Sequence, residues 1–340
     1  MFFDILWILA GLVMIIVGSD WLVDGASGIA RKYGISEFVI GMTIVGIGTS
    51  MPELVASVIS AIGGHGDMAL GNVTGSNICN ILLILGVTAL ISPVGYTRSN
   101  IRKDLPFAIA VSLFLLVVLY NGFGLFGGAP GISRVDALSL LLIFAIFMID
   151  SFKSAKNGTD EDEASAAKPM PMGKAILFIV LGLAGLIFGG QFFVDHTVSI
   201  AERFHVSEAF ISITLMALGT SLPELATCVV AAMKGKNQLA LGNVIGSNIF
   251  NISLIIGTSA AISPFEIQSI STVDMSMVMV SIILLWLAAF TFKRCKLDRI
   301  DGVIFLLAYI AYITYLSMNI LYSYYIIGEG GSIFHPRFVC

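Results

Sequence analysis

The strongest constraint on this chain is a carboxylate that lies inside a long apolar stretch and occurs twice. Glu53 belongs to GTSMPEL, residues 48–54, and Glu224 belongs to GTSLPEL, residues 219–225. An ionisable side chain at bilayer depth costs roughly 2.5 to 3.5 kcal/mol on insertion scales. Two acids in matching apolar surroundings therefore indicate a functional site.

Apolar runs long enough to cross a bilayer recur along most of the chain, and each needs about 20 residues. We predict ten spans, near residues 4–28, 36–62, 67–92, 105–121, 135–152, 174–201, 207–233, 238–263, 274–292 and 301–318. Only 12% of the residues are charged, against about a quarter in soluble domains. The first run is too long, and lacks the basic start, for a cleavable signal peptide. The pattern predicts an all-α polytopic membrane protein.

The two halves of the sequence repeat each other at an offset of 171 residues. This offset relates Glu53 to Glu224, and it also relates the pairs Asp24 and Asp195, Ser36 and Ser207, Gly71 and Gly242, Asn80 and Asn251, and Pro93 and Pro264. Between residues 36 and 93 the register holds without a gap, and about half of the aligned positions are identical. Because each half has five spans, an odd number, the second half enters the membrane from the opposite side. The sequence therefore predicts inverted-topology repeats.

Basic residues set the expected orientation. With the N-terminus outside, 15 of the 18 lysines and arginines fall in inside segments, and only Arg134, Arg203 and Arg337 fall outside. This bias places both termini outside. We predict a first five-helix repeat over 1–152, a cytoplasmic linker loop over 153–173, a second repeat over 174–318 and an extracytoplasmic C-terminal tail over 319–340.

Each acid follows a proline that should interrupt its helix. Pro52 cannot donate a hydrogen bond to the carbonyl of Gly48, so we expect a kink or break just before Glu53 that frees backbone carbonyls as ligands. Thr49 lies four residues before Glu53 and shares its helix face, and Ser50 lies three residues before it. The second half repeats this arrangement with Ala217, Gly219, Thr220, Ser221, Pro223 and Glu224.

The next span of each half begins with a second motif, ALGNVTGSNICN over 69–80 and ALGNVIGSNIFN over 240–251. Two pairs spaced by four residues each place a hydroxyl and an amide on one helix face: Ser76 with Asn80, and Ser247 with Asn251. The glycines Gly71, Gly75, Gly242 and Gly246 would permit close helix packing. Carboxylates, hydroxyls, amide oxygens and free carbonyls together form an all-oxygen shell. Hard cations such as Ca²⁺ and Na⁺ prefer that shell, and the predicted ligand set contains no thiolate or imidazole, which softer metals prefer.

Other polar residues have less specific interpretations. Asp24 and Asp195 are repeat-matched and lie in or near the membrane, where they could serve in gating or bond neighbouring helix ends; Asp20 has no acidic match, because Gln191 occupies that position. Glu37 and Glu208 follow Ser36 and Ser207 at the starts of spans, which is typical of helix capping. The four histidines and four cysteines have no ligand or disulfide spacing.

The paired motifs resemble the two alpha-repeats of the calcium:cation antiporter superfamily, in particular its compact prokaryotic sodium/calcium exchangers. The resemblance covers essentially the whole membrane region. It implies that the second and third helices of each repeat are broken and enclose a diamond of cation sites at mid-membrane. It also implies that the first and sixth helices slide across the bundle to alternate access.

Carried over residue by residue, the resemblance implies Ca²⁺ ligands at Glu53, Glu224, Thr49 and Thr220. Na⁺ would be shared among these and Ser50, Ser76, Asn80, Ser221, Ser247, Asn251 and the carbonyls of Gly46 and Ala217. Some family members carry aspartate where this chain has Asn251. The two remaining carboxylates balance one Ca²⁺ or two Na⁺, so a third Na⁺ would leave the site positive, and K⁺ co-transport is weakly disfavoured.

These features predict a secondary antiporter in which an inward Na⁺ gradient drives Ca²⁺ out by alternating access. We expect no enzymatic activity, no cofactor, no nucleic-acid partner and no required oligomer, in a multi-pass protein of a prokaryotic plasma (inner) membrane. A Ca²⁺/H⁺ antiporter that uses the same glutamates and a passive cation channel remain alternatives. An intramembrane hydrolase is disfavoured, because no HExxH motif and no Ser/His or Cys/His set lies at bilayer depth.

Overall fold

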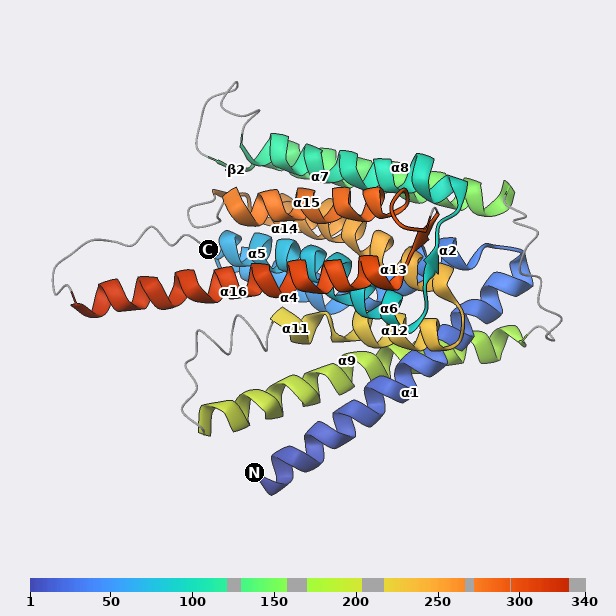
Figure 1. Ribbon diagram of the computed structural model, residues 1–340, viewed down its shortest axis with the longest axis horizontal. Helices are drawn as coiled ribbons and strands as arrows, with labels where there is room; N and C mark the ends of the chain where they lie inside the picture. Colours follow the sequence, from blue (N-terminus) through green and yellow to red (C-terminus); the bar gives the residue numbers. More distant parts are fainter. Residues whose placement is uncertain (121–129, 158–169, 204–216, 267–271, 294, 330–340) are drawn as a thin grey trace.

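The computed structural model describes residues 1–120, 130–157, 170–203, 217–266, 272–293 and 295–329, and these residues are nearly all helical (Figure 1). The first half contains α1 (Phe2–Tyr33), α2 (Glu37–Ile40), η1 (Gly41–Val45), α3 (Gly46–Thr49), α4 (Met51–Ile62), α5 (Gly66–Ile78), η2 (Cys79–Ile84), α6 (Leu85–Ile91), η3 (Asn100–Asp104), α7 (Leu105–Leu119) and α8 (Arg134–Asn157). The second half contains α9 (Met172–Arg203), α11 (Ala217–Thr220), α12 (Leu222–Met233), α13 (Asn237–Phe250), η5 (Asn251–Ile256), α14 (Gly257–Ile262), α15 (Thr272–Ala288) and α16 (Arg299–Glu329). The segments labelled η are π-helical turns that continue the neighbouring α-helices.

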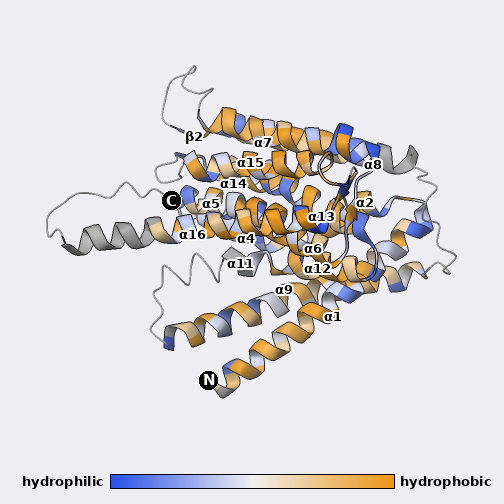
Figure 2. Ribbon diagram, viewed as in Figure 1, coloured by the Kyte–Doolittle hydropathy of each residue, from blue (hydrophilic) through white to orange (hydrophobic). Residues whose placement is uncertain are grey.

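The helices have the length and composition of membrane spans. Six of the described helical stretches are long and apolar enough to cross a bilayer, and residues 37–62 add a bent span. Two shorter apolar helices, α12 and α15, lie among them. Figure 2 shows apolar residues along α1, α7, α15 and α16. The prediction of an all-α polytopic membrane protein is confirmed.

Several helices run past the predicted span ends. The helix α16 continues to Glu329, although its span was expected to end at 318, and α8 continues to Asn157, into the expected linker. The continuation of α8, KSAKN, is polar, so apolar periodicity does not detect it. The expected cap at Ser36 is present, because its Oγ accepts a hydrogen bond from the backbone N–H of Val39 at 3.3 Å. Ser207 and Glu208 lie outside the described residues.

Helices α1 and α9 form an antiparallel pair at one edge of the bundle (Figure 1). Glycines make their backbones touch: a Cβ added at Gly18 would lie 2.8 Å from the carbonyl oxygen of Gly182, and one added at Gly182 would lie 2.7 Å from that of Gly18. Gly11 and Gly25, seven residues to either side of Gly18, make contacts of the same kind with α9. This spacing keeps one glycine stripe in contact along the pair, as small residues do between membrane helices.

Two short sheets join the halves crosswise. Strand β1 (Val94–Gly95) pairs antiparallel with β4 (Lys296–Leu297), and β2 (Gly131–Ile132) pairs with β3 (Phe265–Glu266). Strands β1 and β3 are related by the 171-residue offset. The fifth helices follow the same pattern, because α8 packs on η5 and α14 while α16 packs on η2 and α6. The third helix of each half is therefore covered by the fifth helix of the other.

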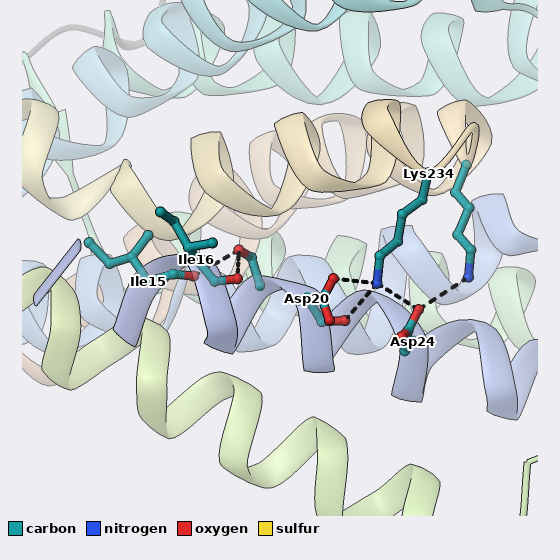
Figure 3. A network of polar contacts seen from close by, with 7 residues as sticks. Ile15, Ile16, Asp20, Asp24 and Lys234 are labelled. Carbon is teal, nitrogen blue, oxygen red and sulfur yellow. Dashed lines mark hydrogen bonds and ion pairs between the residues drawn. The ribbon is translucent and has the colours of Figure 1, made fainter. Parts of the chain in front are cut away.

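An ion-pair cluster attaches α1 to the connection between α12 and α13 (Figure 3). The Nζ of Lys234 lies 2.7 Å from Asp20 Oδ1 and 2.8 Å from Asp24 Oδ1. Burial opposes the charge on Lys234, but its hydrogen bonds to the two aspartates outweigh that effect and raise its pKa. Lys236 is more distant, at 3.9 Å from Asp24 and 4.0 Å from Glu37. Asp24 thus bonds a neighbouring helix end, whereas the repeat-matched Asp195 is exposed.

Replacing Lys234 with methionine should loosen this attachment. All three charged side chains are partly exposed, and pairs of this kind contribute up to about 1 kcal/mol each. We expect K234M to lower the free energy of unfolding by about 1 kcal/mol at low salt and by less at high salt, because exposed charges are screened. Thermal unfolding in detergent at two salt concentrations measures this, with K236M as the matched control that should change less. An effect of K234M that is independent of salt would contradict this explanation.

Candidate cation-binding site

The second helix of each half is interrupted just before its glutamate. Ser50 separates α3 from α4 with φ −86° and ψ 10°, and the helical stretches on either side meet at a bend of 47°. Ser221 separates α11 from α12 with nearly the same angles, −88° and 4°. Pro52 and Pro223 occupy the first turns after these breaks. The predicted interruption before Glu53 is confirmed, and it recurs before Glu224.

The breaks place two carboxylates deep inside the protein. Glu53 and Glu224 are each 1% exposed. The hydroxyl of Ser50, from the first half, donates a hydrogen bond to Glu224 Oε1 of the second half at 2.8 Å. Thr220, from the second half, lies close enough to interact with the Glu53 carboxylate. The two acids are also near enough to repel each other. Each carboxylate is therefore stabilised by the broken helix of the opposite repeat.

Neither carboxylate has a positive partner in the part of the chain that the structure describes, because no ion pair there reaches Glu53 or Glu224. Buried charges are ordinarily paired or bound to metal, since transfer out of water is costly otherwise. The site therefore has a deficit of positive charge, which one divalent cation or two monovalent cations would balance.

Six buried oxygen atoms on the predicted ligand residues have no hydrogen-bond partner among the residues that the structure describes. They are Glu53 Oε2, Glu224 Oε2, Ser76 Oγ, Ser221 Oγ, Asn80 Oδ1 and Asn251 Oδ1. Their elements are packed together, because α12 contacts η2 and α4 contacts η5. Leaving a buried polar atom unpaired costs about 1–3 kcal/mol, so a group of six requires an explanation. Oxygen atoms of these types are the ligands that hard cations select.

Three of the remaining predicted ligands, Thr49, Ser247 and Gly46, meet at the contact between α3 and α13. The Thr49 hydroxyl donates to Asn243 Oδ1 at 3.2 Å, and the Ser247 hydroxyl donates to the carbonyl oxygen of Gly46 at 3.4 Å. Both Thr49 and Ser247 are near enough to interact with the Glu224 carboxylate. Ala217 is the first described residue of α11 and matches Gly46 by the 171-residue offset.

Sequence reasoning missed four residues that support the glutamate helices. Asn72 donates to Ser57 Oγ at 2.9 Å, and its repeat match Asn243 donates to Cys228 Sγ at 3.3 Å. Ser57 and Cys228 are themselves repeat-matched, and each donates to a carbonyl of the following helix. The signal that could have identified these residues is the asparagine in both copies of ALGN. In each copy this asparagine lies four residues before the predicted serine ligand, which is about one helical turn from that serine.

The expected close packing at the motif glycines is present in one half. A Cβ added at Gly242 would lie 2.1 Å from the carbonyl oxygen of Phe38, and one at Gly246 would lie 2.2 Å from that of Met42. No described atom lies within 4 Å of a Cβ added at Gly71 or Gly75. The positions that match Phe38 and Met42 fall within 204–216, outside the described residues.

The site contains no cluster typical of a transition metal. Within the described part of the chain, no group of three or more His, Cys, Asp and Glu side chains could hold a metal ion. Cys79 and Cys228 are buried free thiols, and Cys295 is exposed. The chemistry available is that of two carboxylates with hydroxyl, amide and carbonyl oxygens, which suits reversible binding of Ca²⁺ or Na⁺.

Comparison with known proteins agrees with this geometry. Residues 3–153 and 174–318 match the family described as "Sodium/calcium exchanger protein". The chain is 35% identical over 344 residues to the sodium/calcium exchanger MaX1 of Methanosarcina acetivorans, covering 92% of this chain and 98% of MaX1. It is 38% identical over 272 residues to the inner membrane protein YrbG of Escherichia coli, covering 78% of this chain and 81% of that protein.

The fold is similar to a solved structure of the sodium-calcium exchanger NCX_Mj, which was soaked with Na⁺ and Sr²⁺. The two chains superpose with a TM-score of 0.78 at 33% sequence identity, covering 92% of this chain and 97% of the other. The similarity extends over both halves, so the site described above lies within the shared fold.

Proposed function

This chain belongs to the sodium/calcium exchanger protein family, and from that premise we propose that it exchanges Na⁺ for Ca²⁺ across the membrane by alternating access. Membership makes the protein a multi-pass membrane transporter of the antiporter class and not an enzyme. In the proposed direction, Na⁺ entering down its gradient drives Ca²⁺ out. Both ions compete for overlapping ligands, so neither crosses alone.

The observation that carries this proposal is a set of six unpartnered oxygens, two on the uncompensated carboxylates and four on the hydroxyls and amides near them. We assign Ca²⁺ to Glu53 and Glu224 with the hydroxyls of Thr49 and Thr220. Na⁺ is assigned to these groups together with Ser50, Ser76, Asn80, Ser221, Ser247, Asn251 and the carbonyls of Gly46 and Ala217. Two carboxylates balance one Ca²⁺ or two Na⁺. A site emptied of cations leaves two buried charges unpaired, so the helices are expected to move only when it is occupied.

The proposed orientation places both termini outside the cytoplasm, in a prokaryotic inner membrane. The distribution of 15 basic residues on one side and three on the other supports it. In this orientation residues 1–152 and 174–318 are inverted repeats, and the cluster around Lys234 faces the cytoplasm. The central site is reached alternately from the two sides.

The rival coupling ion is H⁺, which would protonate the glutamates in exchange for Ca²⁺. The surrounding hydroxyl and amide oxygens favour Na⁺, because a proton needs no coordination shell of several oxygens. A passive channel would conduct without a counter-ion.

A flux measurement on purified protein in proteoliposomes distinguishes these possibilities. We expect vesicles loaded with Na⁺ to accumulate ⁴⁵Ca²⁺ when diluted into choline medium, and vesicles loaded with choline to accumulate none. A pH gradient without Na⁺ should not restore uptake. Uptake driven by the pH gradient alone would establish the H⁺ mechanism, and uptake independent of both gradients would establish a channel.

A further inference from the structure

Four asparagines join the third helices of the two halves at the level of the site. They are Asn77 and Asn80 from α5 and η2, and their repeat matches Asn248 and Asn251 from α13 and η5. All four are buried, with exposed fractions of 1%, 1%, 5% and 0%. Asn80 and Asn251 belong to the proposed ligand set, whereas Asn77 and Asn248 do not.

The hydrogen bonds among them repeat with the symmetry of the two halves. Asn77 Nδ2 donates to the backbone carbonyl of Asn248 at 3.3 Å, and Asn248 Nδ2 donates to the backbone carbonyl of Asn77 at 3.2 Å. Asn251 Nδ2 donates to Asn77 Oδ1 at 3.0 Å, and Asn80 Nδ2 donates to Asn248 Oδ1 at 3.0 Å. Each ligand asparagine is thus held by the other half of the protein.

The backbone carbonyls determine which way every amide faces. A carbonyl can only accept a hydrogen bond, so the Asn77 amide must turn its Nδ2 toward Asn248 and its Oδ1 toward Asn251. Asn251 must then present Nδ2 to that oxygen. The Oδ1 of Asn251 therefore faces away from Asn77, and this atom is buried without a hydrogen-bond partner among the described residues. The same reasoning through Asn248 leaves Asn80 Oδ1 unpartnered.

We infer that Asn77 and Asn248 are positioning residues that fix the amides of Asn251 and Asn80 so that oxygen, and not NH₂, faces the transported cation. This inference rests on the proposed function. An amide free to rotate would present its donor group to the site for part of the time and repel a cation. Holding it in one orientation contributes to cation affinity without either positioning residue touching the ion.

The positioning acts across the repeats, which makes it distinguishable from a general structural role. Asn77 acts only through Asn251, and Asn248 acts only through Asn80. Partners that orient metal ligands typically account for roughly 10- to 100-fold in affinity. We therefore expect Asn77→Ala to weaken Na⁺ binding roughly 10- to 100-fold in the wild-type background. The substitution should have little further effect in an Asn251→Ala background, where no amide remains to be positioned.

The experiment measures the Na⁺ concentration that displaces half of the bound ⁴⁵Ca²⁺ from purified protein in detergent, for wild type, N77A, N251A, N80A and the doubles N77A/N251A and N77A/N80A. N77A should lose its effect on Na⁺ affinity when combined with N251A and keep it when combined with N80A. The matched control is Asn100→Ala, which removes another buried asparagine, 1% exposed, whose bonds go to Thr97 and Asp104 in and beside η3. N100A should leave Na⁺ affinity unchanged even if it lowers the melting temperature.

The outcomes separate this inference from the proposed function. Absence of Ca²⁺ binding by the wild type would overturn both. Normal binding by the wild type with unchanged affinity in N77A would overturn the positioning role alone. An N77A effect that persists at full size in the N251A background would also overturn the positioning role. An equal loss of affinity in N100A would do the same. Either result would mean that removing a buried asparagine perturbs the fold in general. Loss of the N77A effect only in the N251A background would support it.

Discussion

Replacing Glu53 with glutamine is expected to abolish Ca²⁺ exchange while leaving the protein at least as stable as the wild type in the absence of ions. Glutamine has the shape of glutamate but no charge, so E53Q leaves one carboxylate to balance a divalent cation. Loss of a residue that only orients a metal ligand costs roughly 10- to 100-fold in affinity. Loss of a charged ligand should cost more, so we expect a decrease of more than about 100-fold in Ca²⁺ affinity and no measurable ⁴⁵Ca²⁺ flux. The symmetric variant E224Q should behave in the same way.

The stability expectation follows from the missing positive partner. Glu53 is buried near Glu224 without an ion pair, and an uncompensated buried charge destabilises the fold. The melting temperature of E53Q in chelator should therefore equal or exceed that of the wild type, and the stabilisation that Ca²⁺ gives the wild type should disappear. Glu37→Gln is the matched control, since Glu37 is a partly buried glutamate of the same span that lies 4.0 Å from Lys236. Saturable Ca²⁺ exchange by E53Q at wild-type affinity would exclude the central site.

The second large effect is expected at Gly246, where α13 crosses η1. A Cβ at this position would lie 2.2 Å from the carbonyl oxygen of Met42 and 2.6 Å from its Cα. Both are backbone atoms, so no side-chain rotation can relieve the overlap and the helices must move apart. Overpacking typically costs 1–3 kcal/mol, and we expect Gly246→Ala to lower the free energy of unfolding by about 3 kcal/mol. Transport should fall with the folded fraction.

A glycine without such a neighbour provides the comparison. No described atom lies within 4 Å of a Cβ added at Gly190, in the middle of α9. Gly190→Ala should be neutral, or stabilising by up to about 1 kcal/mol, because alanine favours the helix. Unfolding by denaturant in detergent measures both variants. Equal stability of G246A and G190A would show that the contact between α13 and η1 is not tightly constrained.

The sequence was sufficient to predict the break before Glu53 because its cause is local. A proline removes one backbone donor, and its effect on the carbonyl of Gly48 follows from covalent structure alone. The repeat then extended that prediction to Glu224. The all-helical membrane fold was predictable for a similar reason, since a bilayer admits only backbones that satisfy their own hydrogen bonds.

Contacts between the halves could not be derived in this way. The offset of 171 residues shows which positions are equivalent, but equivalent residues need not be neighbours. Asn77 contacts both its own match, Asn248, and the match of Asn80. The π-helical turns η2 and η5 add to the difficulty, because an extra residue in a turn changes which side chains share a face. The pairing of Lys234 with Asp20 also breaks the repeat, since Gly63 and Gln191 occupy the matching positions.

The crosswise sheets have a consequence for how the protein is made. The first half contains β1 and β2, but their partners β4 and β3 belong to the second half. When the ribosome has synthesised only the first five helices, β1 and β2 have no partner strands and the third helix is uncovered. Domains that fold as units complete themselves during synthesis, but this half cannot do so until β4 and α16 have been synthesised. Assembly of the transporter is thus a late, whole-chain event, and Glu53 gains its interaction with Thr220 only once the second half has been made.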